Sequence, residues 1–364
     1  MNKRDSASVV ALGLALLPLL ANASCGCGGK RQTGGVFVMT NANRNTVASF
    51  HVNESGTLVS SGNAESTQGK GFGSSSNPLS SQGALTVSGD GRWLVALNAG
   101  SNEISIFNTS GNKLTFSSKS GSKGQFPSSV AASGNRIFVL NKKSPNIAGF
   151  SINKNGELEA IDAGKAVRSL APSTNYSQIG ISPNGKWLVV SNESGNLLLA
   201  YALNGDTLAK DPLTIETSGS GPSAFAFDRH NNLIVAESMS GTVSSYSLSG
   251  DGIKVITAAL PIEQKMPRWI VCNGSFAYTS AMSSGAFPAI SIADDGQLTL
   301  VNRYYAGSND VTELAVNYAG DNLYTFSPKT NIISHFHIET DGTLTYVDNV
   351  LSYFGPSAQG IAAN

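Results

Sequence analysis

The sequence predicts an all-β fold, and three observations lead to that prediction. Short apolar runs rich in Val, Ile and aromatic residues recur along the chain, and they are typical of strands rather than helices. Turn sequences such as Gly89-Asp90-Gly91 and Asn155-Gly156 separate these runs and tolerate positive φ. After the N-terminal segment, no stretch keeps the apolar period of about 3.6 residues that an amphipathic helix needs.

One pattern recurs seven times, at intervals of roughly 43 to 57 residues, which is the spacing of propeller blades. Each copy has an apolar strand that ends in a polar residue, a polar connector, and a second strand that ends in an aromatic or aliphatic residue. One copy reads Trp93–Asn98 and then Ile104–Phe107, and another reads Trp187–Asn192 and then Leu198–Tyr201. We therefore predict an all-β, seven-bladed β-propeller, with a ring of six or eight blades as the alternative if one copy is miscounted.

The two ends of the chain predict how the ring closes. The C-terminal segment Gly355–Ala362 resembles the opening of a blade such as Gly221–Phe227, whereas the first copy of the pattern lacks such an innermost strand. The last strand is therefore expected to complete the blade that the first copy begins, which removes two free sheet edges. Because each sheet buries both faces only between its neighbours, the repeats predict one cooperative domain.

The N-terminus has the features of a secretory signal peptide. The basic residues Lys3 and Arg4 precede the apolar stretch Val9–Leu20, and Ala21-Asn22-Ala23 supplies a cleavage signal of small residues. We expect a protein that is secreted, extracellular or on the cell surface, with no membrane span; a membrane anchor is the alternative. The predicted organisation is a signal peptide at 1–23, a Gly- and Cys-rich leader at 24–31, and one propeller domain at 32–364.

The leader ends in Lys30-Arg31, which is either the cleavage site of a pro-peptide or a solvated basic pair. Cys25 and Cys27 lie in the leader and lack the spacing of a zinc site, and Cys272 lies in a strand-like run as an inert, buried thiol. We therefore expect no disulfide framework, no metal and no cofactor.

Charge is sparse and balanced, because 24 Lys and Arg residues offset 24 Asp and Glu residues. This balance gives no electrostatic reason to expect a nucleic-acid partner, and the chain is expected to be a monomer. Five Asn-x-Ser/Thr sequons after the leader are candidate glycosylation sites. They are Asn53, Asn108, Asn175, Asn192 and Asn273.

The segments Ile179–Val190 and Gly219–Asp228, the latter followed by Leu233–Glu237, resemble the lactonase-type propeller family. This family includes bacterial 6-phosphogluconolactonase and the 3-carboxy-cis,cis-muconate lactonising enzyme. The likeness covers almost the whole chain after the leader. The resemblance implies a seven-bladed propeller that acts on a small lactone or its carboxylate, with His, Arg and Glu side chains at one mouth of the central channel.

The sequence departs from the family at two motifs. The Gly-Pro-Arg-His motif appears as Gly221-Pro222-Ser223-Ala224, and the Ser-Asn-Arg motif appears as Thr279-Ser280-Ala281. Glu237 matches a family catalytic position, and Arg268 opens the next blade, so the two are expected to pair. Our catalytic hypothesis is that Arg268 binds a carboxylate while Glu237 acts as base; the alternative is an ion pair between blades.

A ring of polar residues is expected at the same mouth, where the second strand of each blade ends. Their side chains either bond the backbone of adjacent connectors or bind a neutral, hydroxyl-rich ligand such as a sugar. Besides Glu237, the ring consists of Asn41, Asn98, Asn141, Asn192, Ser280 and Ser327.

Two functions remain open at this point. The first is a lactonase- or muconate-cyclase-like enzyme, that is, a lactone hydrolase or cycloisomerase whose partner is a small lactone or carboxylate. The second is a non-catalytic secreted or cell-surface glycoprotein, either an adhesin or a propeller that binds a glycan. The absence of the family's Arg and His residues favours the second function, and the family resemblance favours the first.

Overall fold

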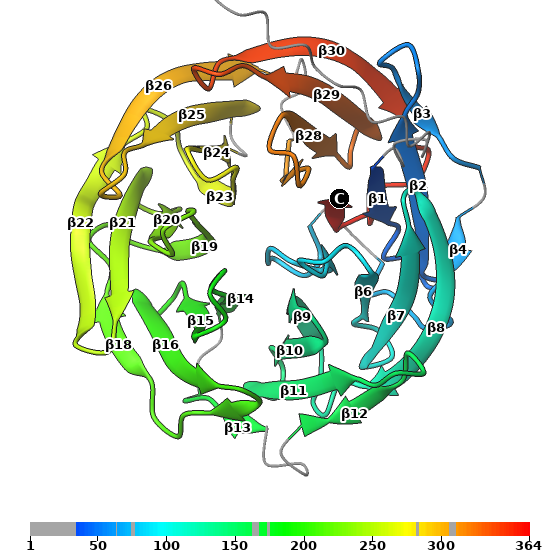
Figure 1. The fold of residues 1–364 in the computed structure, drawn as a ribbon, viewed down its shortest axis with the longest axis horizontal. Helices are drawn as coiled ribbons and strands as arrows, with labels where there is room; N and C mark the ends of the chain where they lie inside the picture. Colours follow the sequence, from blue (N-terminus) through cyan, green and yellow to red (C-terminus); the bar gives the residue numbers. More distant parts are fainter. Residues whose placement is uncertain are drawn as a thin grey trace, which may run out of the picture. The chain divides into compact units, whose positions relative to one another are not determined.

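The computed structural model describes residues 34–62, 64–73, 77–161, 167–172, 175–281, 284–305 and 311–364. The described residues contain no α-helix. They form seven antiparallel sheets around a common axis (Figure 1). The predicted all-β fold with seven blades is therefore confirmed.

We number the blades along the chain and name their strands from the axis outward. Blade 1 contains β5 (Leu85–Val87), β6 (Trp93–Asn98), β7 (Glu103–Ser110) and β8 (Lys113–Gly121). Blade 2 contains β9 (Pro127–Ser133), β10 (Arg136–Asn141), β11 (Asn146–Ile152), β12 (Leu158–Ala160) and β13 (Arg168–Ser169). Blade 3 contains β14 (Tyr176–Ile181), β15 (Trp187–Asn192), β16 (Leu197–Asn204), β17 (Thr207–Leu208) and β18 (Leu213–Glu216).

The remaining blades repeat this order. Blade 4 contains β19 (Pro222–Phe227), β20 (Leu233–Glu237), β21 (Thr242–Ser249) and β22 (Gly252–Pro261). Blade 5 contains β23 (Pro267–Cys272), β24 (Phe276–Ala281), β25 (Ala286–Ile292) and β26 (Leu298–Tyr305). Blade 6 contains β27 (Glu313–Val316), β28 (Asn322–Ser327), β29 (Ile332–Ile338) and β30 (Leu344–Leu351). Blade 7 contains β31 (Ile361–Ala363), β1 (Gly35–Met39), β2 (Thr46–Val52), β3 (Leu58–Ser60) and β4 (Glu65–Ser66).

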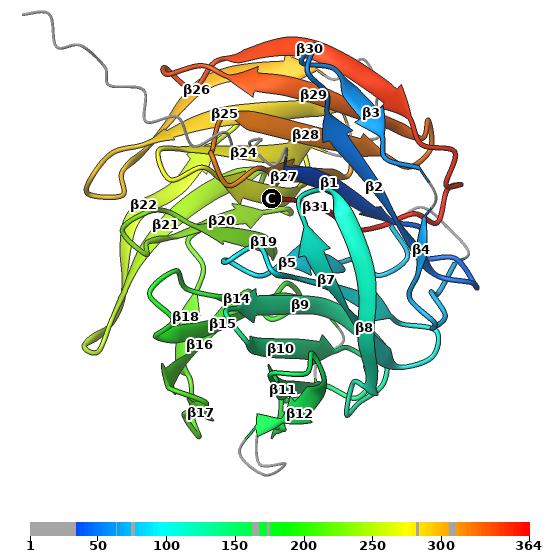
Figure 2. The ribbon, with the colours of Figure 1, turned by 45° about the vertical axis from the view of Figure 1, so that its right-hand side comes forward.

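Blade 7 combines both ends of the propeller. β31 pairs antiparallel with β1, with Phe37 opposite Ala362, and the amide of Met39 donates to the carbonyl of Gly360 at 2.9 Å. The C-terminus accordingly lies inside the ring beside β1 (Figure 1), and Figure 2 shows β31 and β1 side by side from another direction. The predicted closure by the C-terminal strand is confirmed.

Alternation of side chains along each second strand joins neighbouring blades. In β10, Ile137 and Val139 pack with apolar residues of β6, whereas Phe138 and Leu140 pack with those of β15. All four side chains are fully buried. Because the strand period is two, a continuous apolar run covers both faces of one sheet and fills two interfaces at once.

The turns that lead into the second strands have a local cause. In blade 3, the hydroxyl of Ser182 donates to the Asn184 side chain at 2.7 Å and accepts from the amide of Trp187 at 3.0 Å. Gly185 closes this turn with φ of 68°, a region that side chains disfavour. Ser88 and Gly91 repeat the arrangement in blade 1, which explains why the turn motif recurs in the sequence.

Several predictions about the N-terminus fall outside the described residues. These concern the signal peptide at 1–23, the leader at 24–31, its two cysteines and the Lys30-Arg31 pair, so export of the chain stays a prediction. No helix among the residues that the structure describes has the length and apolar character needed to cross a membrane. Within the same residues, no group of three or more His, Cys, Asp or Glu side chains is placed to hold a metal ion.

Candidate functional site

The candidate site lies at one end of the ring axis, which we call the mouth. The second strand of a blade ends there and the innermost strand begins there, because the two pair antiparallel, as in Tyr176 opposite Asn192 and Pro222 opposite Glu237. The residue that follows the second strand is Lys142 in blade 2, Glu193 in blade 3 and Ser238 in blade 4. The mouth thus brings together side chains that lie far apart in sequence.

Glu193 is the carboxylate of this group. Its side chain is only 2% exposed. Its Oε2 accepts from the Asn175 amide at 2.6 Å and from the Ser177 hydroxyl at 3.2 Å, and its Oε1 accepts from the Ser238 hydroxyl at 2.7 Å. These donors fix the carboxylate and compensate its removal from water.

Arg268, the second residue of β23, is the nearest cation to this carboxylate. Its Nη2 lies 3.5 Å from Glu193 Oε1, and its side chain is 21% exposed. Both residues line a cavity of about 540 Å³ between blades 3, 4 and 5. The other lining residues are Ser238, Met239, Ser240, Gly241, Gln264, Lys265 and Met266.

Lys142 supplies a second positive charge beside the same pair. Its ammonium donates to the carbonyl oxygens of Leu79 and Ser80 at 3.2 and 3.1 Å. Burial lowers the pKa of Lys142 to about 8; the Glu193 charge opposes this shift and the Arg268 charge adds to it. Lys142 therefore loses its proton just above neutral pH, unlike an ordinary lysine.

The expected pair of Glu237 and Arg268 is not what the structure shows, because the ion pair of Arg268 is with Glu193. Glu237 is fully buried. Its carboxylate accepts from the amide of Gly219 at 2.8 Å and from the hydroxyls of Thr242 and Ser244 at 2.6 and 2.9 Å. These contacts join the end of β20 to β21 and to the segment that precedes β19. A catalytic role for Glu237 stays a prediction that no observation supports.

The predicted polar ring exists, but its members lie beneath the surface. Each residue is at most 6% exposed, and several bond neighbouring connectors: Asn98 accepts from Asn45 and Thr67, and Asn141 donates to the carbonyl of Ser122. This is the bonding role that the sequence left open. Sugar binding by the ring stays a prediction, and it would require these buried groups to become accessible. The members are Asn41, Asn98, Asn141, Asn192, Glu237, Ser280 and Ser327.

The sequons differ in accessibility. Asn108 is exposed on β7, whereas Asn192 is 6% exposed, so a glycan at Asn192 would require local opening of blade 3. Asn53, Asn175 and Asn273 are partly exposed.

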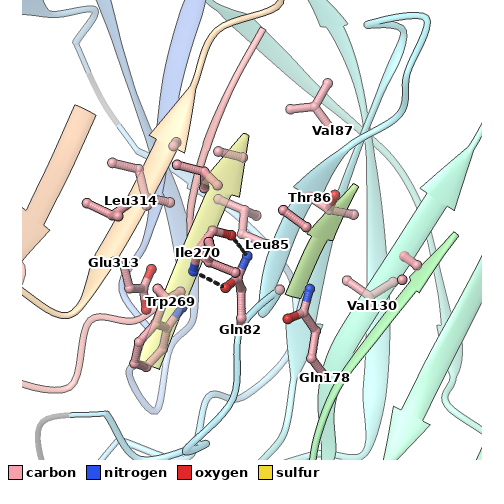
Figure 3. Close-up of a pocket in the computed structure, with 18 of the residues that line it drawn as sticks. Gln82, Leu85, Thr86, Val87, Val130, Gln178, Trp269, Ile270, Glu313 and Leu314 are labelled. Carbon is pink, nitrogen blue, oxygen red and sulfur yellow. Dashed lines mark hydrogen bonds between the residues drawn. The ribbon is translucent and has the colours of Figure 1, made fainter. Parts of the chain in front are cut away.

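The central channel, along the axis from the mouth, holds a separate cavity of about 360 Å³, lined by the innermost strands of all seven blades (Figure 3). Cys272 lines it, and burial raises the pKa of this thiol to about 12, which agrees with an unreactive cysteine. Burial also raises the pKa of Glu313 to about 8, although the amide of Gly360 donates to its carboxyl at 2.7 Å.

Sequence reasoning missed Glu193 and Lys142. Both directly follow an Asn that ends a second strand, and the sequence pattern predicts that Asn, rather than the residue after it, at the mouth. The sequence did contain a signal. Lys142, Glu193 and Ser238 occupy the same position in three blades, directly after the second strand, and two of the three are charged. Chemically, the group offers a fixed carboxylate that can hold a proton and two cations that can hold an anion or a developing negative charge.

Comparison with known proteins identifies the family. The sequence profile of the family described as "Lactonase, 7-bladed beta-propeller" matches residues 31–171, 154–255 and 237–361. The chain belongs to this lactonase family. None of the curated proteins matches the sequence of this lactonase-family chain.

Solved structures resemble the chain over nearly its whole length. A candidate 6-phosphogluconolactonase from Bacteroides fragilis is 18% identical, with a TM-score of 0.72 over 92% of this chain and 98% of that chain. The periplasmic gluconolactonase of Pseudomonas aeruginosa is 15% identical, with a TM-score of 0.70 over 91% and 98%. At such low identities, the likeness shows that this lactonase-family member shares their fold.

Proposed function

We propose that this lactonase-family propeller hydrolyses a small lactone that carries a carboxylate or phosphate, and that it does so at the mouth. The observation that carries the proposal is the convergence of Glu193, Arg268 and Lys142 there. Glu193 and Arg268 border one cavity, and the charges of both act on Lys142. A lactone hydrolase needs a proton acceptor for water and positive charge for the carbonyl oxygen. This group supplies both.

In the proposed reaction, Glu193 accepts a proton from a water molecule whose oxygen bonds to the lactone carbonyl carbon. The ring C–O bond then breaks, and the proton passes from Glu193 to the ring oxygen, which leaves a hydroxy acid. Arg268 faces the cavity and holds the anionic group of the substrate. Lys142 lies beside Glu193 and stabilises negative charge that develops during attack.

The test compares glucono-δ-lactone, which is neutral, with 6-phosphoglucono-δ-lactone in a pH-stat assay of the purified chain. We expect turnover of the phosphorylated lactone with a lower KM. Arg268→Gln should remove that preference, whereas Arg229→Gln, a change in an exposed Arg that pairs with Asp294, should not. Wild-type rates equal to spontaneous hydrolysis for both lactones would contradict the proposal.

One observation favours a second candidate, a propeller that binds an anionic ligand without turnover. The oxygens of Glu193 already accept from three side chains and pair with Arg268, so the carboxylate is engaged before a water molecule reaches it. Calorimetry with 6-phosphogluconate separates the two candidates. Binding that depends on Arg268 but comes with no lactone turnover would identify the binding protein.

A further inference from the structure

The segment Asn77–Gly83, which leads into β5, extends from blade 1 toward the centre of the ring (Figure 1). There, the side-chain amide of Gln82 donates to the carbonyl of Ile270 at 2.8 Å, and its oxygen accepts from the amide of Ile270 at 2.9 Å (Figure 3). Ile270 lies in β23 of blade 5. Blades 1 and 5 are three steps apart in a ring of seven, so this contact crosses the axis.

The two hydrogen bonds have a clear physical reason. The innermost strand of a blade has an edge that faces the axis and carries unpaired backbone groups. A glutamine amide offers one donor and one acceptor, and it can therefore replace a neighbouring strand at one residue. Gln178 makes the same pair of bonds with Phe225 of β19, at 2.9 and 2.7 Å. The Gln82 contact differs from the Gln178 contact in one respect, which is that the segment carrying Gln82 also binds Lys142.

The segment that carries Gln82 also holds Lys142. The carbonyl oxygens of Leu79 and Ser80 accept from the Lys142 ammonium. The segment is fixed at other points, because the amide of Leu79 donates to Gln359 at 2.9 Å and the Ser129 hydroxyl donates to the carbonyl of Gln82 at 2.6 Å. One short segment thus binds the lysine of blade 2 and the strand of blade 5.

We propose that Gln82 is a positioning residue that holds Arg268 and Lys142 at a set separation across the mouth. Arg268 precedes Ile270 by two residues on the same strand, and Lys142 is held by carbonyls two and three residues before Gln82. The inference rests on the proposed function, since it assigns Gln82 to the anion site of that reaction.

The charges explain why such a device is needed. Lys142 and Arg268 repel each other, because both are cations, and the Arg268 charge accordingly helps to lower the pKa of Lys142. Without a bound anion, this repulsion favours separation of the two cations. The ion pair with Glu193 opposes it weakly, because Arg268 Nη2 and Glu193 Oε1 are 3.5 Å apart. A cross-axis contact keeps both cations in place before the substrate arrives, so less binding energy is spent on ordering them.

The experiment uses the full chain with Gln82→Met, which keeps the side-chain volume and removes both bonds, and Gln82→Ala as a second variant. Gln178→Met is the matched control, because it removes the same two kinds of bond from β19, which carries neither cation. Acetic anhydride labelling of Lys142, resolved by peptide mass spectrometry and referenced to Lys119, reports the lysine directly. KM and kcat for 6-phosphoglucono-δ-lactone report how well the site binds and converts an anionic lactone.

We expect the Gln82 variants to label several-fold faster at Lys142 and to raise KM about tenfold with a smaller change in kcat, since a displaced cation weakens binding of the anion. Gln178→Met should change neither quantity. Unchanged labelling in both Gln82 variants, or equal effects in Gln178→Met, would overturn the inference. If the wild type hydrolyses no lactone while labelling still responds to Gln82 alone, the proposed function fails and the positioning of Lys142 stands.

Discussion

Blades 3 and 4 each place a glutamate at the end of the second strand, and the two carboxylates have different surroundings. In blade 3 the strand ends in Asn192 and Glu193 follows; in blade 4 it ends in Glu237 and Ser238 follows. Backbone bonds show the equivalence, because the amide of Glu193 donates to Asn175 and that of Ser238 donates to Gly221. Glu193 borders the mouth cavity beside Arg268, whereas Glu237 is enclosed by hydroxyls and an amide.

The comparison shows that one residue of offset decides what a carboxylate can do. The residue that ends the strand is buried and bonds neighbouring segments, and the next residue, Glu193 or Ser238, lines the mouth cavity. A buried glutamate at the first position stabilises the blade, and one at the second position meets the cations of other blades. Chemical similarity to a family position is therefore a weaker guide than the exact place relative to the strand end.

The largest effect should come from Glu193→Gln. Losing the proton acceptor is expected to lower kcat for an anionic lactone by about 10²–10⁴-fold. The fold should persist, since the amide retains one acceptor for the surrounding donors. Steady-state kinetics measure kcat, and urea unfolding of the same preparation measures the free energy of unfolding. A variant with wild-type kcat would remove Glu193 from the chemistry.

Glu237→Gln should give the opposite result. We expect a loss of about 2 kcal/mol in the free energy of unfolding, because charge-assisted bonds to the buried carboxylate are weakened, and kcat close to wild type. Urea unfolding with parallel kinetics checks this. If Glu237→Gln abolishes turnover at unchanged stability, the two glutamates have exchanged roles.

Gly219→Ala sharpens the same comparison without changing a charge. A methyl group at this position would clash with the Glu237 carboxylate and the Thr242 hydroxyl. We expect a loss of about 1–3 kcal/mol in the free energy of unfolding. Gly121→Ala is the control, because nothing lies within 4 Å of its added methyl group. Equal stability of the two variants would show that the network around Glu237 is loose.

The smallest effect concerns pH. Lys142 has a pKa of about 8 in the folded chain, so its charge is lost as the pH rises from 7 to 9 and affinity for 6-phosphogluconate should fall. Lys142→Arg should flatten this dependence in calorimetry. Because the lysine pKa is lower in the folded than in the unfolded chain, the unfolded state binds more protons above pH 8, and the lysine's contribution to stability rises with pH there. If the affinity for 6-phosphogluconate depends on pH in the same way in the wild type and in Lys142→Arg, Lys142 is excluded from the anion site.

Much of the fold could be predicted because its causes are local and repeated. Each copy contains its own turn, as at Ser182–Gly185, and its own continuous apolar run, and the closing strand Ile361–Ala363 repeats the opening of a blade. Seven repetitions make the pattern visible where one would be ambiguous.

The site was predicted only in part, for physical reasons that the sequence does not display. Arg268 was identified because it opens a blade, but its partner depends on whether a carboxylate stands at or after a strand end. The contact of Gln82 with Ile270 joins positions 188 residues apart. It depends on a segment that crosses the axis, occurs in blade 1 alone among the described residues, and has no repeat to reveal it.

The pairing of β31 with β1 also has a consequence for synthesis. Blade 7 pairs β1 with β31, which is synthesised after all the strands of blades 1 to 6, so this blade cannot form until β31 has left the ribosome. Until then the inner edge of β1 has no partner, and the incomplete ring exposes a surface that another chain can occupy. The ring of this propeller therefore closes only after blades 1 to 6 have been made, and a change that displaces Ala363 from β1 would leave the newly made protein open.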